Sequence, residues 1–223
     1  MTIPRLLTAM ITPYDDKLQV DYARAAELAD YLANNGSEGI VVSGTTGESP
    51  VLTDEEKLKL FAAVKGKLGK RIPVWAGTGS NDTQHSLELS KEAEKLGVDG
   101  VMLVCPYYSK PSQEGLYQHF RKIAGAISLP VMLYNVPGRT GINLLPETVT
   151  RLAKIENIVA IKEASGSMDQ VSTLMTLLPE EMTVYSGDDS LTLPMMALGA
   201  RGVVSIASHL VGKEILAMID AFG

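Results

Sequence analysis

Lys162 is the residue with the clearest capacity for chemistry. It follows the apolar run Ile158, Val159, Ala160 and Ile161, which is typical of a buried strand. Alternation along a strand would place Lys162 on the same inward face as Ile158 and Ala160, whereas the other two residues of the run would face covering helices. Burial lowers the pKa of a lysine from about 10.4, and an amine that is neutral near physiological pH can form a Schiff base. A lysine that reaches solvent at the rim, or one that pairs with a carboxylate, fits the sequence equally well.

Tyr134 lies at the matching place near the end of the preceding apolar run. A phenol beside a carbinolamine can carry protons while an imine forms, so Tyr134 is a candidate general acid and base. A core tyrosine whose hydroxyl is hydrogen-bonded is the ordinary alternative.

Two further segments could hold anions. Residues 44–48 (GTTGE) contain Thr45 and Thr46 between glycines, so that N–H groups and hydroxyls can converge on a carboxylate. Arg139, in the segment GRTG, could bind a second carboxylate through two N–H groups, although a solvated surface arginine is the commoner case. Tyr108, after another apolar run, could belong to the same region or simply pack.

The chain offers no metal or nucleotide signature, so we expect no cofactor. His85, His119 and His209 are scattered without helical metal spacing, and Cys105 is the single cysteine. No sequence feature supplies Cys105 with a base, so we expect a small buried residue rather than a nucleophile. Residues 77–80 (GTGS) lack the full dinucleotide fingerprint.

Eight short apolar runs alternate with stretches of helical spacing. The predicted strands are residues 6–12, 39–44, 73–77, 100–106, 130–136, 158–164, 183–187 and 202–207. Runs that are apolar on both faces are typical of parallel strands covered by helices. Eight such units predict an α/β fold, a TIM (β/α)8 barrel with a parallel closed sheet, as a single domain over residues 1–223. A doubly wound open sheet is the main alternative.

The helix signals agree with this reading. Thr53 and Glu56 form a capping-box pattern, which predicts a helix that begins at Asp54. Further helices are predicted over residues 82–95 and, at the end of the chain, 213–222. Active sites of such barrels lie at the C-terminal ends of the strands. The candidates that fall there are Thr45, Thr46, Tyr108, Tyr134, Arg139 and Lys162, and we therefore expect one catalytic mouth.

Charge and composition limit the class of partner. A net charge of -6 argues against nucleic acid and anionic membranes, which attract basic surfaces. No apolar stretch approaches the roughly 20 residues that span a bilayer. Pro4 and Arg5 interrupt the start of the chain, so no signal peptide is expected, and the single cysteine suits a cytoplasmic protein.

Four motifs give a more specific reading in combination. They are GTTGESPVLT (44–53), YNVPGRTG (134–141), IKEASG (161–166) and SGDD (186–189). Together they resemble the dihydrodipicolinate synthase (4-hydroxy-tetrahydrodipicolinate synthase) family, pyruvate-dependent class I aldolases related to N-acetylneuraminate lyase. The resemblance implies that Lys162 forms an imine with pyruvate. It also implies that Tyr134, Thr45 and Tyr108 relay protons, with Tyr108 supplied by a neighbouring subunit of a homo-oligomer, and that Thr46 holds the pyruvate carboxylate.

The resemblance also implies a second substrate. Arg139 matches the residue that binds the carboxylate of L-aspartate 4-semialdehyde, and Gly187 and Val204 match backbone positions that line the cavity. The implied activity is 4-hydroxy-tetrahydrodipicolinate synthesis, in the diaminopimelate pathway to lysine. A lyase acting on N-acetylneuraminate or a 2-keto-3-deoxy sugar acid, and a truncated barrel with impaired or no catalysis, are the alternatives.

Two features depart from the family pattern. Family members usually continue into a C-terminal helical extension, whereas this sequence stops at Gly223. Lysine-inhibited members bind lysine in a cleft that corresponds to residues near Ser49, Asp54, Lys57, Asn81, His85 and Tyr107. Lys57 would place a cation where the amine of the inhibitor lies, so we expect weak or absent inhibition by lysine.

Overall fold

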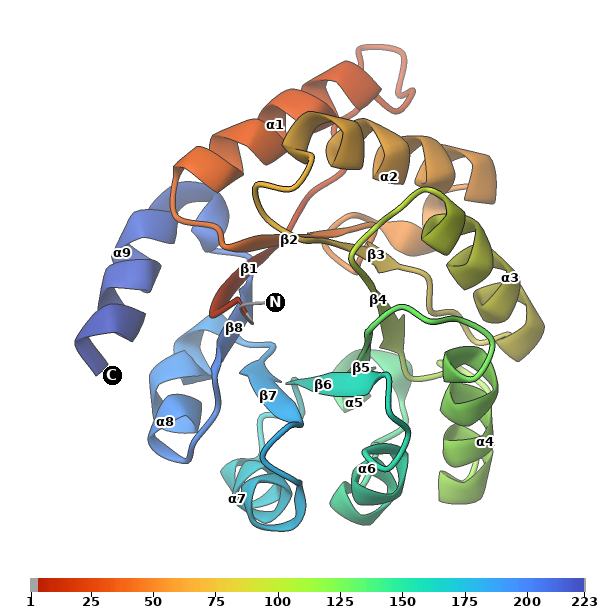
Figure 1. The fold of residues 1–223 in the computed structure, drawn as a ribbon, viewed down its shortest axis with the longest axis vertical. Coiled ribbons are helices and arrows are strands. Elements are labelled where there is room, and N and C mark those ends of the chain that lie inside the picture. The colour runs from red at the N-terminus through yellow and green to blue at the C-terminus, as the bar shows by residue number, and fades with distance from the viewer. Residues whose placement is uncertain (1–3, 223) are drawn as a thin grey trace.

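The strands form a closed parallel barrel in which each strand pairs with the next in the chain and the eighth pairs with the first (Figure 1). This computed structural model describes residues 4–222; residues 1–3 and 223, which the predicted single domain includes, lie outside the described part. The strands are β1 (Leu6–Ala9), β2 (Gly39–Val42), β3 (Val74–Gly77), β4 (Gly100–Val104), β5 (Val131–Asn135), β6 (Ile158–Glu163), β7 (Thr183–Ser186) and β8 (Gly202–Ser205). The closed barrel is confirmed and the open sheet is wrong.

Several strands end earlier than predicted. β1 stops at Ala9 rather than at residue 12, and β8 stops at Ser205 rather than at residue 207. The residues beyond these ends leave the ladder for the loops of the barrel mouth, where their side chains and N–H groups are free to bind other groups.

Helices cover the outside of the barrel (Figure 1). They are α1 (Tyr22–Asn34), α2 (Asp54–Leu68), α3 (Thr83–Lys95), α4 (Gln113–Ala124), α5 (Pro137–Thr140), α6 (Pro146–Leu152), α7 (Met168–Leu177), α8 (Thr192–Ala197) and α9 (Ser208–Phe222), with short 3-10 turns η1 (Ser49–Val51) and η2 (Asp189–Leu191). No helix within residues 4–222 is long and apolar enough to cross a bilayer.

The helix boundaries follow the local signals, with one exception. The capping box of α2 is present: the Thr53 hydroxyl accepts from the N–H of Glu56, and the Glu56 carboxylate accepts from the N–H of Thr53. The last helix was predicted to begin at residue 213 but begins at Ser208, because a helical turn precedes a kink at Val211. The non-helical backbone at Val211 hides this turn from a search for helical periodicity.

Two apolar cores meet across the strands. Inside the barrel, Leu7, Val41 and Met102 pack with residues of the other strands, while a larger core that includes Ile40 and Leu133 lies between strands and helices. Inward and outward residues therefore alternate along the strands, as the pleat requires.

β6 departs from simple alternation because it carries a bulge. Neighbouring residues of β5 pair with Ile158 and Ala160, so that Val159 has no partner in the register. Ile158 consequently packs in the outer core and Val159 against the inner core, so the prediction for these two residues is wrong. Beyond the bulge the predicted faces are confirmed: Ala160 faces the inner core and Ile161 the outer core. The bulge leaves the predicted inward direction of Lys162 intact.

Candidate active site

Lys162 and Tyr134 lie side by side at the C-terminal ends of β6 and β5. They are partners in the strand register, and the Nζ atom of Lys162 lies 4.3 Å from the centroid of the Tyr134 ring. Each residue is 4% exposed. An ammonium over an aromatic face is stabilised by the ring, but a neutral amine at the same place has a free lone pair for attack.

The environment of Lys162 favours the neutral amine. Burial lowers its pKa from the ordinary value to about 8; the charge of Asp189 acts to raise the pKa and that of Arg139 to lower it further. Within residues 4–222 no carboxylate lies within ion-pair distance of the amine. The structure therefore disfavours both ordinary alternatives, a rim lysine and an ion-paired one.

Gly187, directly after β7, forms the surface along which the Lys162 side chain extends. Its N–H donates to the carbonyl of Glu163 at 2.8 Å, which fixes the backbone beside the lysine. A Cβ atom at Gly187 would lie 3.0 Å from Cε of Lys162 and 3.2 Å from its Cγ. The absence of a side chain here leaves room for the extended lysine.

Tyr134 has a hydroxyl partner across the barrel mouth. Burial raises the pKa of Tyr134, while a hydrogen bond with the Thr45 side chain and the charge of Arg139 oppose the rise. Thr45 belongs to the loop after β2 and is exposed at the mouth. The structure thus brings together the first two members of the predicted proton relay, beside the amine.

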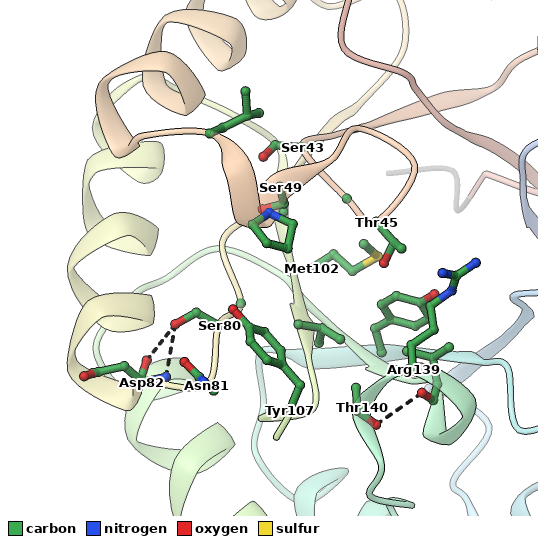
Figure 2. A pocket seen from close by; sticks show the side chains of 18 of the residues that line it. Ser43, Thr45, Ser49, Ser80, Asn81, Asp82, Met102, Tyr107, Arg139 and Thr140 are labelled. Carbon is green, nitrogen blue, oxygen red and sulfur yellow. Dashed lines mark hydrogen bonds between the residues drawn. The ribbon is translucent and has the colours of Figure 1, made fainter. Parts of the chain in front are cut away.

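A cavity of about 950 Å³ opens over Tyr134 and Thr45. Thr45, Tyr108, Tyr134 and Arg139 line it, and Figure 2 shows Thr45 and Arg139 bordering the same space. Arg139 is exposed on α5, the short helix that follows β5. A cation at this rim can hold a carboxylate that enters the cavity.

The other predicted residues lie around this centre. Thr46 is half-buried in the loop after Thr45, and Val204 is buried on β8 inside the barrel. Neither Thr46, Val204, Gly187 nor Lys162 is among the residues that line the open cavity. Lys162 and Gly187 lie against each other, and Val204 belongs to the inner core together with Tyr134.

Tyr108 is the most exposed of the candidates. It is 88% exposed, with a left-handed backbone (φ 72) after β4, and its N–H donates to the carbonyl of Thr140. A large exposed side chain held by such a backbone costs free energy within a single chain.

Two buried or half-buried acids were not singled out from the sequence. Glu163 is 1% exposed on the outer face of β6, and its carboxylate accepts from the N–H of Ser165 and from the amides of Asn135 and Gln170. Asp189 begins η2 and acts on the pKa of Lys162. Both belong to quoted motifs, and a carboxylate within an apolar strand is itself a signal for a partnered acid. Within the described part of the chain, no cluster of side chains could hold a metal ion.

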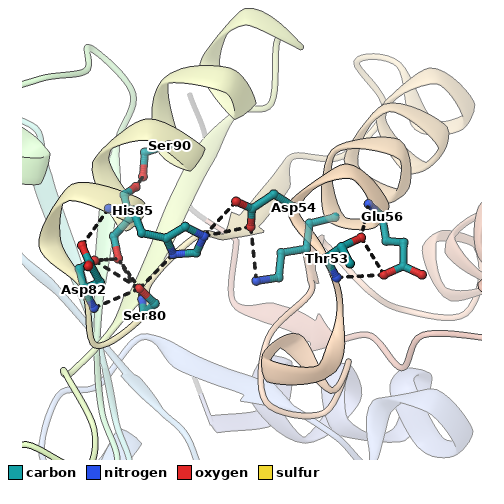
Figure 3. Close-up of polar contacts among 9 residues, drawn as sticks. Thr53, Asp54, Glu56, Ser80, Asp82, His85 and Ser90 are labelled. Atoms are coloured by element: carbon teal, nitrogen blue, oxygen red, sulfur yellow. Dashed lines mark hydrogen bonds and ion pairs between the residues drawn. The ribbon is translucent and has the colours of Figure 1, made fainter.

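The cavity extends into a second lobe lined by charged residues. Lys57 is 7% exposed there, burial lowers its pKa, and its Nζ lies 3.9 Å from the Asp54 carboxylate. Figure 3 shows His85 between Asp54 and Ser80; its Nε2 lies 2.8 Å from Asp54 and its Nδ1 3.1 Å from Ser80. Asp54 is therefore engaged by two nitrogen groups, which leaves less negative charge for an incoming ammonium.

We expect L-lysine to be a poor inhibitor for this reason. Activity measured against rising lysine should fall by less than half at about 1 mM, because Lys57 repels the amine of the ligand. Lys57→Gln removes the cation and should lower the half-inhibiting concentration. Half-inhibition of the unaltered chain below 1 mM would contradict the prediction.

Comparison with known proteins agrees with the geometry. The family model of the dihydrodipicolinate synthetase family matches residues 2–223. A 4-hydroxy-tetrahydrodipicolinate synthase of Heliobacterium modesticaldum is 61% identical over 99% of this chain and 74% of its own length. One from Desulforamulus reducens is 63% identical over 98% of this chain and 74% of its own.

Solved structures give the same result. The crystal structure of a dihydrodipicolinate synthase from Bacillus anthracis superposes with a TM-score of 0.98 at 53% identity, covering 100% of this chain and 76% of that one. A lysine-bound enzyme from Cyanidioschyzon merolae gives a TM-score of 0.96 at 50% identity, covering 98% and 74%. Sequence, fold and the lysine at the end of β6 thus agree, and the chain belongs to the dihydrodipicolinate synthetase family.

Proposed function

We propose that this chain is a lyase that condenses pyruvate with L-aspartate 4-semialdehyde to give 4-hydroxy-tetrahydrodipicolinate, in the diaminopimelate route to lysine. Relatives more than 60% identical over nearly the whole chain carry the name of this activity. The observation that carries the proposal is the buried Lys162, with its pKa lowered to about 8, packed on Tyr134.

The first step is imine formation. The neutral amine of Lys162 attacks C2 of pyruvate; the carbonyl oxygen takes a proton and the nitrogen releases one, which gives a neutral carbinolamine. A second proton on that hydroxyl lets it leave as water, which gives the iminium. In this proposal Tyr134 and Thr45 carry these protons; the packing of Lys162 on the Tyr134 ring and the hydrogen bond between the two side chains support this role. Thr46 holds the pyruvate carboxylate in this proposal.

The second half forms the carbon–carbon bond. Loss of a proton from the pyruvate methyl group turns the iminium into an enamine, whose carbon attacks the aldehyde, and the aldehyde oxygen is protonated. The amine of the second substrate then displaces Lys162 by transimination, which closes the ring and frees the lysine. Arg139 at the cavity rim binds the carboxylate of the semialdehyde. In this proposal Gly187 and Val204 contribute backbone to the site outside the open cavity.

Tyr108 completes the relay from a neighbouring subunit in this proposal, so the protein acts as a homo-oligomer. The 88% exposure of its side chain supports a role outside its own chain. Specific activity should then fall as the protein is diluted toward monomer, measured by enzyme assay and sedimentation across the same concentrations. Tyr108→Phe should associate as before but lose activity; a fully active monomer would contradict the proposal.

Substrate comparison tests the proposal. Condensation of pyruvate with L-aspartate 4-semialdehyde should exceed cleavage of N-acetylneuraminate or a 2-keto-3-deoxy sugar acid by about 10³-fold or more in kcat/KM. The cation at Arg139 favours a small substrate with a carboxylate over a polyhydroxylated one. Faster cleavage of a sugar acid would establish the other lyase, and no turnover of any substrate would establish an inactive barrel.

The remaining parts of the proposal concern organisation. One domain over residues 1–223 is supported by a single closed barrel whose eight strands lie between Leu6 and Ser205. A cytoplasmic setting is supported by the single cysteine, Cys105, which is buried and unpaired.

A further inference from the structure

Asp189 joins the loops that follow β7 and β8 at the barrel mouth. Its carboxylate accepts from the hydroxyl of Ser205 and from the N–H groups of Ile206 and Ala207, both at 3.0 Å. These three hydrogen bonds fix both carboxylate oxygens in place. All three donors are neutral, so they orient the charge without neutralising it.

The fixed charge of Asp189 acts on Lys162, which lies on β6, two strands away from β8 in the barrel. Asp189 raises the pKa of Lys162, against the dominant effect of burial and against Arg139, whose charge lowers it. Two tyrosines neighbour Lys162 on the adjacent strands. The Tyr134 ring lies over Nζ, and Tyr185, the register partner on β7, donates its hydroxyl to a backbone carbonyl at 2.6 Å. Asp189 lies in the loop whose Gly187 packs on Lys162, and its charge and the opposing charge of Arg139 both act on this amine.

Asp189 also affects the position of the backbone beside Lys162. Gly187, which packs along the Lys162 side chain, lies two residues before Asp189 in the same loop. Because the Asp189 carboxylate is bound to the loop after β8, the segment that carries Gly187 is held at both ends: by the ladder of β7 and by these hydrogen bonds. Charge and position thus depend on the same side chain.

We propose that Asp189 is a positioning residue that acts through Lys162, as the fixed counter-charge for the cationic forms of that lysine. The inference rests on the proposed function and adds a residue to it. When the amine attacks a ketone and the carbinolamine loses water, nitrogen becomes an iminium with one positive charge. That charge disappears when the neighbouring carbon loses a proton and the enamine forms. Asp189 stabilises the iminium by charge alone and takes no proton, since its oxygens are occupied as hydrogen-bond acceptors.

Removal of this charge has two opposite effects, which a purely structural role would not produce. The pKa of the Lys162 amine falls, so more of the lysine is neutral and nucleophilic at pH 7. The iminium loses its counter-charge, so less adduct is present at equilibrium. Attack at low pH becomes faster relative to the plateau rate, while affinity for pyruvate becomes weaker.

Asp189→Asn is the sharpest test, because an amide oxygen can still accept from the two N–H groups and the amide can donate to Ser205. Asp188→Asn is the matched control: Asp188 is exposed, and its side chain contacts only Ser190 in the described structure. Ser205→Ala keeps the charge and removes one of the hydrogen bonds that fix it. Thermal unfolding of each variant shows whether it is folded.

The pKa of Lys162 is measured first, by competitive labelling with acetic anhydride from pH 6 to 11 and mass spectrometry of the Lys162 peptide. Asp189→Asn should shift the midpoint to lower pH by about half a unit to one unit, and the other two variants should leave it within a few tenths of a unit. An unchanged or raised midpoint in folded Asp189→Asn overturns the proposal. So does an equal downward shift in Ser205→Ala, because that would make position rather than charge the cause.

Borohydride trapping with pyruvate gives the second measurement. Asp189→Asn should need about tenfold more pyruvate for half-maximal adduct at pH 8, whereas Asp188→Asn should need the same amount as the unaltered chain. Unweakened adduct formation by Asp189→Asn also overturns the counter-charge. Absence of an adduct in the unaltered chain counts against the proposed function instead, and the labelling midpoint still decides the effect of Asp189 on Lys162.

Discussion

Lys162→Ala should form no adduct when incubated with pyruvate and reduced with borohydride, and its kcat/KM should fall by at least about 10⁴-fold. The reason is that Lys162 lies beside Tyr134 with its pKa lowered to about 8, whereas Lys57, the other buried lysine of the described residues, lies in the second lobe beside Asp54. Intact-protein mass spectrometry measures the adduct. Lys154→Ala, at an exposed lysine before β6, is the matched control and should react fully.

The pH dependence follows from the same pKa. The neutral amine is the reactive form, so the rate of adduct formation should rise with pH and reach half of its plateau at about pH 8. A rise centred near the ordinary lysine value of about 10.4 would show that burial does not activate this residue. An adduct that persists in Lys162→Ala would place the imine on another lysine.

A neutral, unbranched replacement one atom shorter tests what burial of the lysine costs. Because the folded pKa is lowered, the unfolded chain holds a proton at Lys162 between about pH 8 and 10.4 that the folded chain lacks. The free energy of unfolding therefore rises with pH through this window. Lys162→Met should be more stable than the unaltered chain by about 1–3 kcal/mol at pH 7, and this difference should vanish near pH 11, as measured by urea unfolding.

The fold could be predicted because its signals are local. Short runs apolar on both faces, separated by amphipathic stretches, leave few architectures other than a helix-covered parallel barrel. The bulge in β6 could not be predicted, because Val159 loses its partner only in register with β5. The early start of α9 was missed for a comparable reason: the kink at Val211 interrupts the helical period.

The candidate site also contains residues that the sequence could predict and features that it could not. Lys162, Tyr134 and Arg139 could be selected because each has a distinctive side chain near a strand end, and strand ends of a parallel barrel converge. The influence of Asp189 on the amine depends on hydrogen bonds to a loop 16 to 18 residues away in sequence. The packing of Gly187 against Lys162 is a contact between the residue that follows β7 and a residue of β6. Neither is visible in the spacing of residues along the chain.

Gly187→Ala should reduce kcat/KM by about 10²-fold or more while the chain still folds. The new methyl group would lie 3.0 Å from Cε of Lys162 and 2.7 Å from the Cβ of Ala164, and contacts this short force the neighbours to move. Displacement of the amine by a fraction of an ångström removes it from the Tyr134 ring and from the path of attack on a carbonyl. Urea unfolding should show a loss of about 1–3 kcal/mol from the overpacking.

Two further variants separate the contact with the lysine from the general strain. Gly66→Ala, on α2 with open space around it, should keep full activity and gain about 0.5–1 kcal/mol. In the double variant Gly187→Ala with Ala164→Gly, the 2.7 Å contact disappears but those to Lys162 remain. Stability should then recover in part while adduct formation stays slow. Recovery of both would assign the loss to Ala164, whereas recovery of stability alone makes the open surface at Gly187 a requirement for placing the nucleophile.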